Sequence, residues 1–354
     1  MEAWLDHSSA PRAGEELDLE RLAAYLDRQL PEIQGALEVE QFPSGFSNLT
    51  YLLRRGEHEL VLRRPPFGNQ VKTAHDMSRE HRVLSALHGA YPTPRPYLYC
   101  DEDSVLGAPF YIMERVRGII LRKTLPEGLQ LSPVLAGRLS RSLITQLAAL
   151  HQLDADALGL SDLGRPEGYV ERQVKGWTKR YHRAQTDTWK ELDQVIAWLH
   201  DDMPDDHSGS LVHNDYKYDN LVLDPDDLTR VVAVLDWEMC TVGDPWLDLG
   251  TTLAYWTEEG DDPQFKALAF GPTAIPGSLT RQQLVEEYQH LTGRKVTNLT
   301  FYYAFGLFKL AVIVQQIYYR FFHGHTQDPR FAQLNHMVGL LGKAGLQAIE
   351  SDRI

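Results

Sequence analysis

Leu211-Val-His-Asn-Asp-Tyr-Lys-Tyr-Asp-Asn220 is the stretch of this chain that decides its fold, and Leu235-Asp-Trp237 follows it after an apolar run. Together they supply an Asp, a Lys two places on, an Asn five places on and a second Asp beyond the apolar run. Phosphoryl transfer from a metal-bound nucleotide needs such a set, because Mg²⁺ takes carboxylate or amide oxygens and an acceptor hydroxyl needs a carboxylate that takes its proton. The sequence therefore predicts Asp215 as the base, with Asn220 and Asp236 as ligands of Mg²⁺.

Each of these residues also has a simpler interpretation, and at the level of sequence both stay open. Asp215 lies in a polar loop between apolar runs, where an isolated Asp would stabilise an Asx turn. Asp236 ends the predicted buried strand 231–235, so it either meets a cation or caps the next turn. Lys217 is predicted to contact the transferred phosphate or to be a solvated loop lysine. His213 is expected to be a core histidine that donates a hydrogen bond to the backbone.

Length and composition limit the class of protein. A chain of 354 residues exceeds the usual size of a single core, which favours two lobes. The net charge of −14 argues against a nucleic-acid partner. The N-terminus does not resemble a signal peptide, and two distant cysteines, Cys100 and Cys240, are expected to be buried thiols in a reducing cytoplasm. The apolar stretch 301–322 is interrupted by charged and amide residues, and its apolar and aromatic residues follow helical spacing, so it is predicted to be a buried helix and not a membrane span.

The pattern of apolar residues changes along the chain from strand-like to helical. A leading helix capped by Asp18 precedes several short strands, and Gly118 is a candidate boundary between the two parts. From about residue 132 onward the pattern is mostly helical, with short β pieces around the catalytic stretch. The fold class predicted from this order is α+β. The predicted helices cover 18–30, 75–88, 186–200, a segment that carries Leu139, Leu143, Leu147 and Leu150, and segments beginning at Pro245 and Thr280, and the predicted strands cover 37–42, 49–53, 59–63, 97–101 and 110–114.

The segment from His213 to Asn220, taken with Asp236, resembles the catalytic loop and metal-binding Asp of the aminoglycoside phosphotransferase and choline kinase group. Further stretches, Gly45-Phe-Ser-Asn-Leu-Thr-Tyr, Val61-Leu-Arg-Arg-Pro-Pro and Gly243-Asp-Pro-Trp-Leu-Asp-Leu-Gly, resemble the phosphotransferase domains fused to some acyl-CoA dehydrogenases. The resemblance implies a two-lobed protein kinase-like fold. Residues 1–116 would form a small β-rich N-lobe that includes the leading helix, and this lobe would bind the nucleotide. Residues 117–354 would form a mostly helical C-lobe that contains the catalytic loop and the acceptor pocket.

The main departure from that family is at residue 63. The strand position that usually carries a phosphate-gripping lysine is Arg63 here, a permanent cation whose planar fork is not equivalent to a point charge. The resemblance makes Glu80 its partner. The sequence supports this independently, because Glu80 shares a helical face with Met77, Leu84 and Leu87, so it points inward and needs a cation.

The remaining nucleotide contacts follow from the resemblance alone. Ser47 and Asn48 belong to the loop over the phosphates, which holds a single glycine, Gly45, so that backbone amides and the Ser47 hydroxyl would hold the phosphates. Glu114 and Val116 lie in the hinge whose backbone would hold the adenine.

The residues after Asp236 also differ from those of protein kinases. Glu238 replaces the glycine of their Asp-Phe-Gly segment, which argues against an activation-loop flip. Either Asp244 or Asp248 is expected to accept backbone N–H bonds from the catalytic loop, or both are acids at a helix N-terminus.

The sequence therefore predicts an ATP- and Mg²⁺-dependent kinase that phosphorylates a hydroxyl of a small molecule, either a hydroxyacyl-type metabolite or an aminoglycoside. Two alternatives remain open: a nucleotide-binding scaffold without turnover, motivated by Arg63 and the thin phosphate loop, and a metal-dependent phosphohydrolase that uses His213, Asp215 and Asp236. Helical segments 160–205 and 301–322 would shape the acceptor pocket. Its aromatic candidates, which would more often be core residues, are Trp177, Tyr181, Tyr303 and Tyr318.

Overall fold

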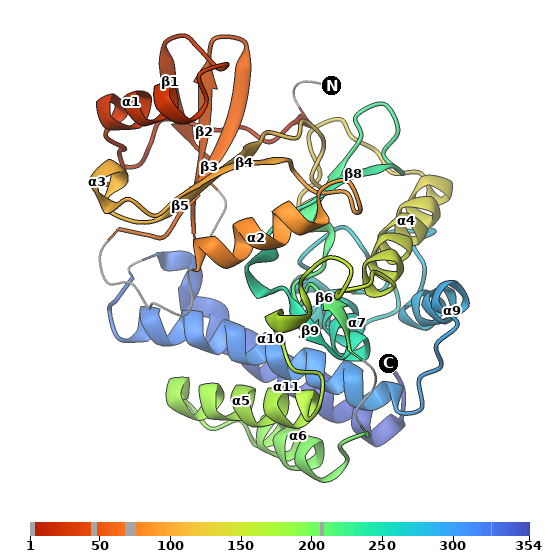
Figure 1. The fold of residues 1–354 in the computed structure, drawn as a ribbon. Coiled ribbons are helices and arrows are strands. Elements are labelled where there is room, and N and C mark those ends of the chain that lie inside the picture. Colours follow the sequence, from red (N-terminus) through yellow and green to blue (C-terminus); the bar gives the residue numbers. More distant parts are fainter. Residues whose placement is uncertain (1–3, 44–47, 68–75, 206–208, 327) are drawn as a thin grey trace. The chain divides into compact units, whose positions relative to one another are not determined.

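The computed structural model describes residues 4–43, 48–67, 76–205, 209–326 and 328–354 (Figure 1). Contacts along the chain divide it into two compact units: Met1–Ile120 with Leu221–Cys240, and Leu121–Asn220 with Thr241–Ile354. Each unit therefore combines two separate stretches of sequence. This differs from the continuous ranges 1–116 and 117–354, because the stretch that carries Asp236 groups with the first unit and the stretch that carries Asp215 with the second.

The first unit is built on a five-stranded antiparallel sheet with the strand order β1-β2-β3-β5-β4. The register places Arg63 of β3 opposite Thr50 of β2 and Tyr111 of β5. The bounds are β1 Leu37–Gln41, β2 Leu49–Arg55, β3 His58–Arg64, β4 Pro96–Cys100 and β5 Phe110–Glu114, with helices α1 Leu19–Gln29, α2 Met77–Leu87 and α3 Asp103–Leu106.

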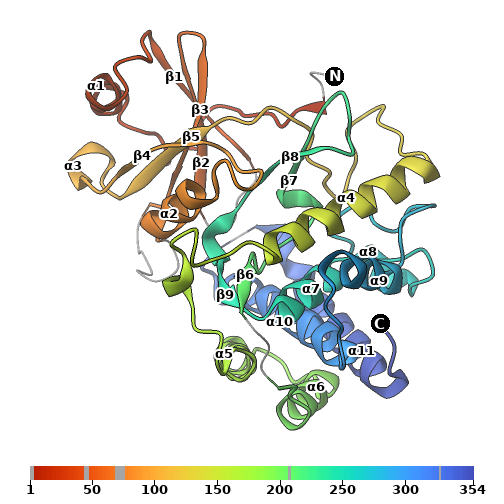
Figure 2. The ribbon, with the colours of Figure 1, turned by 45° about the vertical axis from the view of Figure 1, so that its right-hand side comes forward.

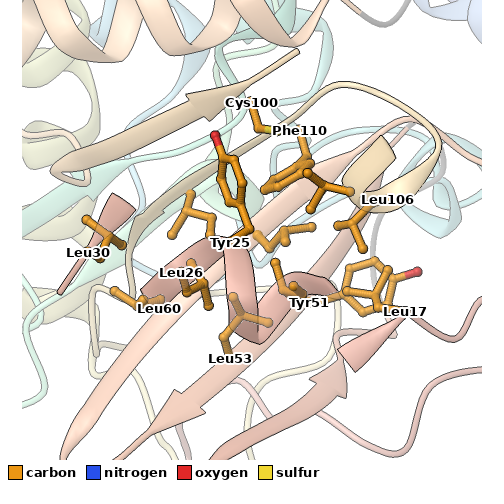
Figure 3. Packing of buried hydrophobic residues seen from close by; sticks show 14 of the residues in the cluster. Leu17, Tyr25, Leu26, Leu30, Tyr51, Leu53, Leu60, Cys100, Leu106 and Phe110 are labelled. Carbon is orange, nitrogen blue, oxygen red and sulfur yellow. The ribbon is translucent and has the colours of Figure 1, made fainter. Parts of the chain in front are cut away.

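One face of this sheet is covered by α1. The carboxylate of Asp18 caps the helix by accepting from the backbone N–H of Arg21, as predicted. From the helix, Tyr25 and Leu26 lie close to side chains of the sheet (Figure 3). The rings of Tyr25 and Phe110 meet edge to face with centroids 5.8 Å apart. Each apolar side chain buried in this way contributes about 1.5–3 kcal/mol, so the leading helix is part of the core of this unit.

The stretch 221–240 joins this unit through backbone hydrogen bonds. Its two strands, β7 Leu221–Leu223 and β8 Val231–Val234, pair antiparallel. Ile119 and Leu223 exchange backbone hydrogen bonds of 2.8 Å, and the N–H of Val234 donates to the carbonyl of Pro92 at 2.9 Å. These bonds place the residues that follow β8, including Asp236, within the first unit.

The second unit is mostly helical, and Figures 1 and 2 both show α5 beside α6 and α11 beside α10. Two short strands, β6 Ser210–Val212 and β9 Thr241–Gly243, pair antiparallel within it. Its helices are α4 Pro133–His151, α5 Tyr169–Ala184, α6 Lys190–Asp201, α7 Pro245–Ala254, α8 Pro263–Ala267, α9 Arg281–Thr292, α10 Leu299–Phe322 and α11 Leu334–Ser351.

Helices α7 and α10 approach each other closely through two glycines. A Cβ atom on Gly250 would lie 2.1 Å from the carbonyl oxygen of Tyr302, and one on Gly306 would lie 2.2 Å from the carbonyl oxygen of Gly250. No real side chain tolerates such distances, so glycine at both positions is what allows this contact. The contact matters for the site because α7 and α10 both supply residues that hold the catalytic loop.

Within the described ranges, α10 is the one helix that has the length and apolar composition to cross a membrane, and 83% of its most apolar window is buried inside the structure. This agrees with the prediction of a buried helix for 301–322. Trp177, Tyr181 and Tyr303 are likewise buried, as aromatic core residues are, and Tyr318 is partly buried. The two cysteines are buried free thiols.

Candidate active site

The catalytic stretch forms a loop in the second unit, between β6 and a single 3₁₀ turn at Tyr218–Asn220. The pairing of β6 with β9 holds its beginning, and the turn holds its end. Asn214 has a backbone φ of +60°, in the left-handed region that asparagine tolerates better than most residues. The chain therefore bends sharply just before Asp215.

The carboxylate of Asp215 is surrounded by donors within the same unit. Lys217 Nζ lies 3.0 Å from Oδ1 and 2.8 Å from Oδ2. The hydroxyl of Tyr255 donates to Oδ1 at 2.6 Å, and Asn220 Nδ2 donates to Oδ2 at 3.1 Å. Burial opposes ionisation of Asp215, but Lys217 and the Tyr255 hydroxyl hold its pKa below the usual range. The predicted base is therefore an oriented carboxylate that stays ionised.

Lys217 is not a solvated loop lysine. Its ammonium pairs with Asp215 and lies 4.6 Å from the centroid of the Tyr255 ring, and 21% of its side chain is exposed. Burial acts against its charge, yet the neighbouring Tyr255 and Asp215 raise its pKa. The predicted contact of Lys217 with a phosphate stays a prediction, but a permanent positive charge does stand beside the carboxylate of Asp215.

Asn220 has an amide orientation that suits a metal ligand. Its Nδ2 donates to the backbone carbonyl of Asp215 at 2.8 Å as well as to the Asp215 carboxylate. Because both neighbours are acceptors, the amide nitrogen faces them and the amide oxygen points away. An amide oxygen is a ligand that Mg²⁺ accepts.

The backbone of the loop is held by buried side chains behind it. Asp248 Oδ2 accepts the N–H of His213 at 2.7 Å and contacts His151 Nε2 at 3.1 Å, while the other nitrogen of His151 lies 2.7 Å from the hydroxyl of Tyr288. This bears out Asp248 as the acid that accepts loop N–H bonds. Asp244 instead caps α7 by accepting from the N–H of Trp246 at 2.7 Å.

His213 is buried in the core, as predicted, but one of its hydrogen bonds runs in the opposite direction. Its Nδ1 accepts the backbone N–H of Asp215 at 3.3 Å, whereas the sequence suggested a donating histidine. A turn as tight as this one leaves the N–H of Asp215 facing back toward the ring. The imidazole therefore helps to fix the loop.

The first unit contains a second group of charged residues around Arg63. Its two terminal nitrogens donate to Glu80 Oε1 at 2.6 Å and to Asp236 Oδ1 at 3.0 Å, and Glu238 lies 3.9 Å away. Arg63 is 7% exposed and Glu80 1%. The predicted pairing of Arg63 with Glu80 is thus present. Burial disfavours the charge on Arg63, but the carboxylates, led by Glu80, raise its pKa.

Asp236 follows β8 with a backbone φ of +66° and leads into the 3₁₀ turn Trp237–Met239. Arg63 donates to its Oδ1 at 3.0 Å. Within the described part of the chain no cluster of three or more His, Cys, Asp or Glu side chains forms a metal site. A single carboxylate of this kind is a ligand that Mg²⁺ accepts.

The other predicted nucleotide contacts lie in or beside the sheet of the first unit. Asn48 is 2% exposed and its Nδ2 donates to Glu238 Oε2 at 2.8 Å. Ser47 lies outside the described residues. Glu114 ends β5, where its backbone N–H donates to the carbonyl of Arg95 at 2.8 Å, and Val116 is partly buried just beyond. The N–H of Glu114 is therefore already used.

Comparison with known proteins identifies the family. The sequence model of the phosphotransferase enzyme family matches residues 38–281. The chain belongs to this family. Acyl-CoA dehydrogenase family member 11 of Rattus norvegicus is 36% identical to it over 340 residues, which are 93% of this chain and 43% of the rat protein. This phosphotransferase family member thus spans less than half the length of that relative, as the resemblance to fused domains suggested.

Solved structures show the same fold. A protein of Ralstonia eutropha JMP134 assigned as an aminoglycoside phosphotransferase has a TM-score of 0.80 and 33% identity, and the alignment covers 95% of this chain and 99% of that one. A thermostable mutant of aminoglycoside phosphotransferase APH(4)-Ia, solved with AMP-PNP and hygromycin B, has a TM-score of 0.59 at 15% identity over 92% and 98% of the chains. The predicted two-lobed, kinase-like α+β fold is confirmed.

Sequence reasoning missed two residues that contact the catalytic loop of this family member. Tyr255, at the end of α7, bonds Asp215, and Lys309 of α10 bonds the Asn214 carbonyl at 2.7 Å. Tyr255 also lines a small cavity of about 10 Å³ beside Lys217. Nothing in the local sequence around either residue marks it as part of a site.

Proposed function

We propose that this chain is an ATP- and Mg²⁺-dependent phosphotransferase that phosphorylates a hydroxyl of a small molecule. Membership of the phosphotransferase family supports transfer of a phosphoryl group to a small molecule. AMP-PNP in the complex of APH(4)-Ia supports the use of a nucleotide. The observation that carries the proposal is the carboxylate of Asp215, which is oriented by three donors and has a lowered pKa.

In this proposal each residue has a separate task. Asp215 orients the acceptor hydroxyl and takes its proton, which in a loose transition state depends more on orientation than on basicity. Lys217 places a positive charge beside the transferred group. The oxygens of Asn220 and Asp236 would hold Mg²⁺, which supplies charge neutralisation at the phosphates when bound. Arg63, fixed by Glu80, anchors the phosphates.

The related proteins favour two chemical classes of acceptor. The similarity to acyl-CoA dehydrogenase family member 11 favours a hydroxyacyl-type metabolite. The aminoglycoside hygromycin B in the complex of APH(4)-Ia makes an aminoglycoside the alternative. The cavity beside Lys217 has room for about one water molecule, so an acceptor group that entered there would have to move its lining residues, among them Phe270.

The test is acceptor-dependent release of ADP, measured over a panel of hydroxyacids, hydroxyacyl thioesters and aminoglycosides. Asp215→Asn is expected to lower turnover about 100-fold or more, the usual contribution of a general base. Asp193→Asn, which alters an exposed carboxylate on α6, serves as the control and is expected to leave turnover unchanged. Turnover of Asp215→Asn within about threefold of wild type would contradict the proposal.

A nucleotide-binding scaffold without turnover is the second candidate. The bond from Arg63 to Asp236 favours it, because that arginine competes with a metal ion for the same carboxylate. Thermal-shift measurements with ATP and Mg²⁺, set beside the ADP assay, separate the two functions. Binding without transfer to any acceptor would favour the scaffold.

A further inference from the structure

Lys309 lies within the buried helix α10 and takes no part in the function proposed above. It is 2% exposed, between the buried residues Phe308 and Leu310. Burial lowers its pKa to about 8, although Asp248 and Asp215 partly oppose the shift. A methionine would fill a similar volume without the cost of burying an amine. Lys309 is therefore a buried amine that lowers the stability of the folded protein.

The contacts of Lys309 lead to the catalytic loop. Its Nζ donates to the backbone carbonyl of Asn214 at 2.7 Å and to Thr251 Oγ1 at 3.4 Å, and it lies 5.7 Å from the centroid of the Trp177 ring. Both hydrogen-bond acceptors are uncharged. The shorter bond is made to the residue immediately before Asp215.

The peptide unit between Asn214 and Asp215 is held by hydrogen bonds at both its carbonyl and its N–H. The carbonyl of Asn214 and the N–H of Asp215 belong to the same planar peptide unit. Lys309 binds the carbonyl, while His213 Nδ1 accepts the N–H at 3.3 Å. The left-handed φ of Asn214 is a conformation that needs support from its surroundings. Fixing the plane restricts the direction in which the side chain of Asp215 leaves the backbone, because only the φ torsion of Asp215 is then left to vary.

We propose that Lys309 is a positioning residue that holds the peptide plane between Asn214 and Asp215 and thereby aims the carboxylate of Asp215. The inference rests on the proposed function, in which that carboxylate orients the acceptor hydroxyl. A residue that only filled space in the helix would leave the loop unaffected when replaced by another of the same size.

The charge of Lys309 provides a readout that a purely structural role would not give. The charged groups around it are Asp248 from α7, Asp215 and Lys217 from the catalytic loop, and Arg180 from α5. An ammonium makes a stronger hydrogen bond to a carbonyl than a neutral amine does. The bond to Asn214 therefore weakens as pH rises through about 8, and the loop loosens with it.

Hydrogen exchange of the amides in residues 211–217 tests the inference. At pH 7 these amides are expected to exchange about tenfold faster in Lys309→Met than in wild type, the effect of losing one charge-assisted hydrogen bond. Lys343→Met, which removes an exposed lysine from α11, is the control and should match wild type. Equal protection of 211–217 in Lys309→Met and wild type overturns the inference.

The wild-type protein provides a second measurement that does not depend on the folding of a variant. Protection of 211–217, corrected for the intrinsic exchange rate, is expected to fall as pH rises through about 8, and Lys309→Met should lack this fall. If Lys309→Met fails to fold, Lys309→Gln takes its place, since a neutral amide cannot titrate. A pH-independent protection in wild type counts against the inference.

Kinetics separate positioning from simple structural support. In the ADP assay, kcat of Lys309→Met is expected to fall about tenfold with KM for ATP unchanged. Faster exchange with full kcat would mean that Lys309 supports the loop without aiming Asp215, and the inference would be wrong. A failure of the proposed function would be seen in a different measurement, as unimpaired turnover of Asp215→Asn or as no turnover of wild type. The difference in hydrogen exchange between Lys309→Met and wild type would not be affected by it.

Discussion

Arg63 binds two carboxylates at once through separate nitrogens, a geometry that lysine does not offer. Its planar fork places one nitrogen on Glu80 and the other on Asp236, so the predicted metal ligand is partly neutralised before any ion arrives. A lysine has three N–H donors but they share one nitrogen, so it cannot span the two carboxylates as the two arms of the guanidinium do, and its contact with Asp236 is expected to be weaker. The arginine thus holds Asp236 in place and weakens its attraction for a cation.

Arg63→Lys is expected to lower the Mg²⁺ concentration that half-saturates ATP-dependent thermal stabilisation by several-fold. The physical reason is that Asp236 Oδ1 loses its competing donor at 3.0 Å. Arg54→Lys, at a partly exposed position of β2 where the pair with Glu40 can be kept, is the matched control. An unchanged or higher Mg²⁺ requirement would show that the bond from Arg63 does not compete with the metal.

The sequence could predict those candidate site residues that lie close together along the chain, because their spacing forms a pattern. Asp215 and Asn220 belong to one continuous motif, so spacing was enough to connect them, whereas Asp248 was one of two candidate acids in a separate stretch. Tyr255 reaches Asp215 across 40 positions and Lys309 reaches Asn214 across 95. Only the packing of α7 and α10 brings these two residues to the loop, and a lysine in an apolar helix could not be told from one at its surface.

The contact between α7 and α10 depends on glycine at two positions, which makes it sensitive to the addition of a single methyl group. Gly306→Ala would place a methyl group 2.2 Å from the carbonyl oxygen of Gly250. We expect a loss of about 1–3 kcal/mol in the free energy of unfolding, the usual cost of overpacking. Gly260→Ala, where a Cβ meets open space, is the control. Urea titration of both variants gives the result, and equal stability of the two would contradict the close contact.

Most strands and helices followed from local pattern, and the exceptions have physical reasons. The helix predicted to begin at Thr280 is present, where Thr280 and Gln283 form a capping box and Gly293 ends the helix in the left-handed conformation. Helix α5 was not predicted as a separate element, because long polar side chains dominate its sequence. Its buried positions, Val170, Val174, Trp177 and Tyr181, do keep helical spacing. The division into units could not be predicted, since the pairing of Leu223 with Ile119 is a long-range contact.

The stability of the whole protein should depend on pH through Lys309. Its pKa is lowered to about 8 in the folded state and returns to about 10.5 on unfolding. Below pH 8 both states carry the proton, and the folded state bears the full cost of the buried charge. Between pH 8 and 10.5 the unfolded state binds more protons, so the free energy of unfolding rises with pH. This contribution amounts to about 3 kcal/mol in total.

Urea unfolding of wild type and Lys309→Met from pH 7 to 10 measures this contribution. Other titrating groups are shared by the two proteins and cancel in the difference. The stability of wild type relative to Lys309→Met is expected to improve steadily above pH 8, whereas the difference between wild type and Lys343→Met stays constant. A constant difference for Lys309→Met would show that the amine keeps its ordinary pKa in the folded protein.

The discontinuous first unit has a consequence for how the protein is made. The ribosome releases Met1–Ile120 early, but Leu221–Cys240, which completes the same unit, follows only after residues 121–220. At about 5–20 residues per second, translation of the intervening stretch takes roughly 5–20 s. During that interval the nascent chain can pair Arg63 with Glu80, but Asp236 has not yet been synthesised. The backbone of Ile119 likewise lacks its hydrogen-bond partner, Leu223, until that residue is translated.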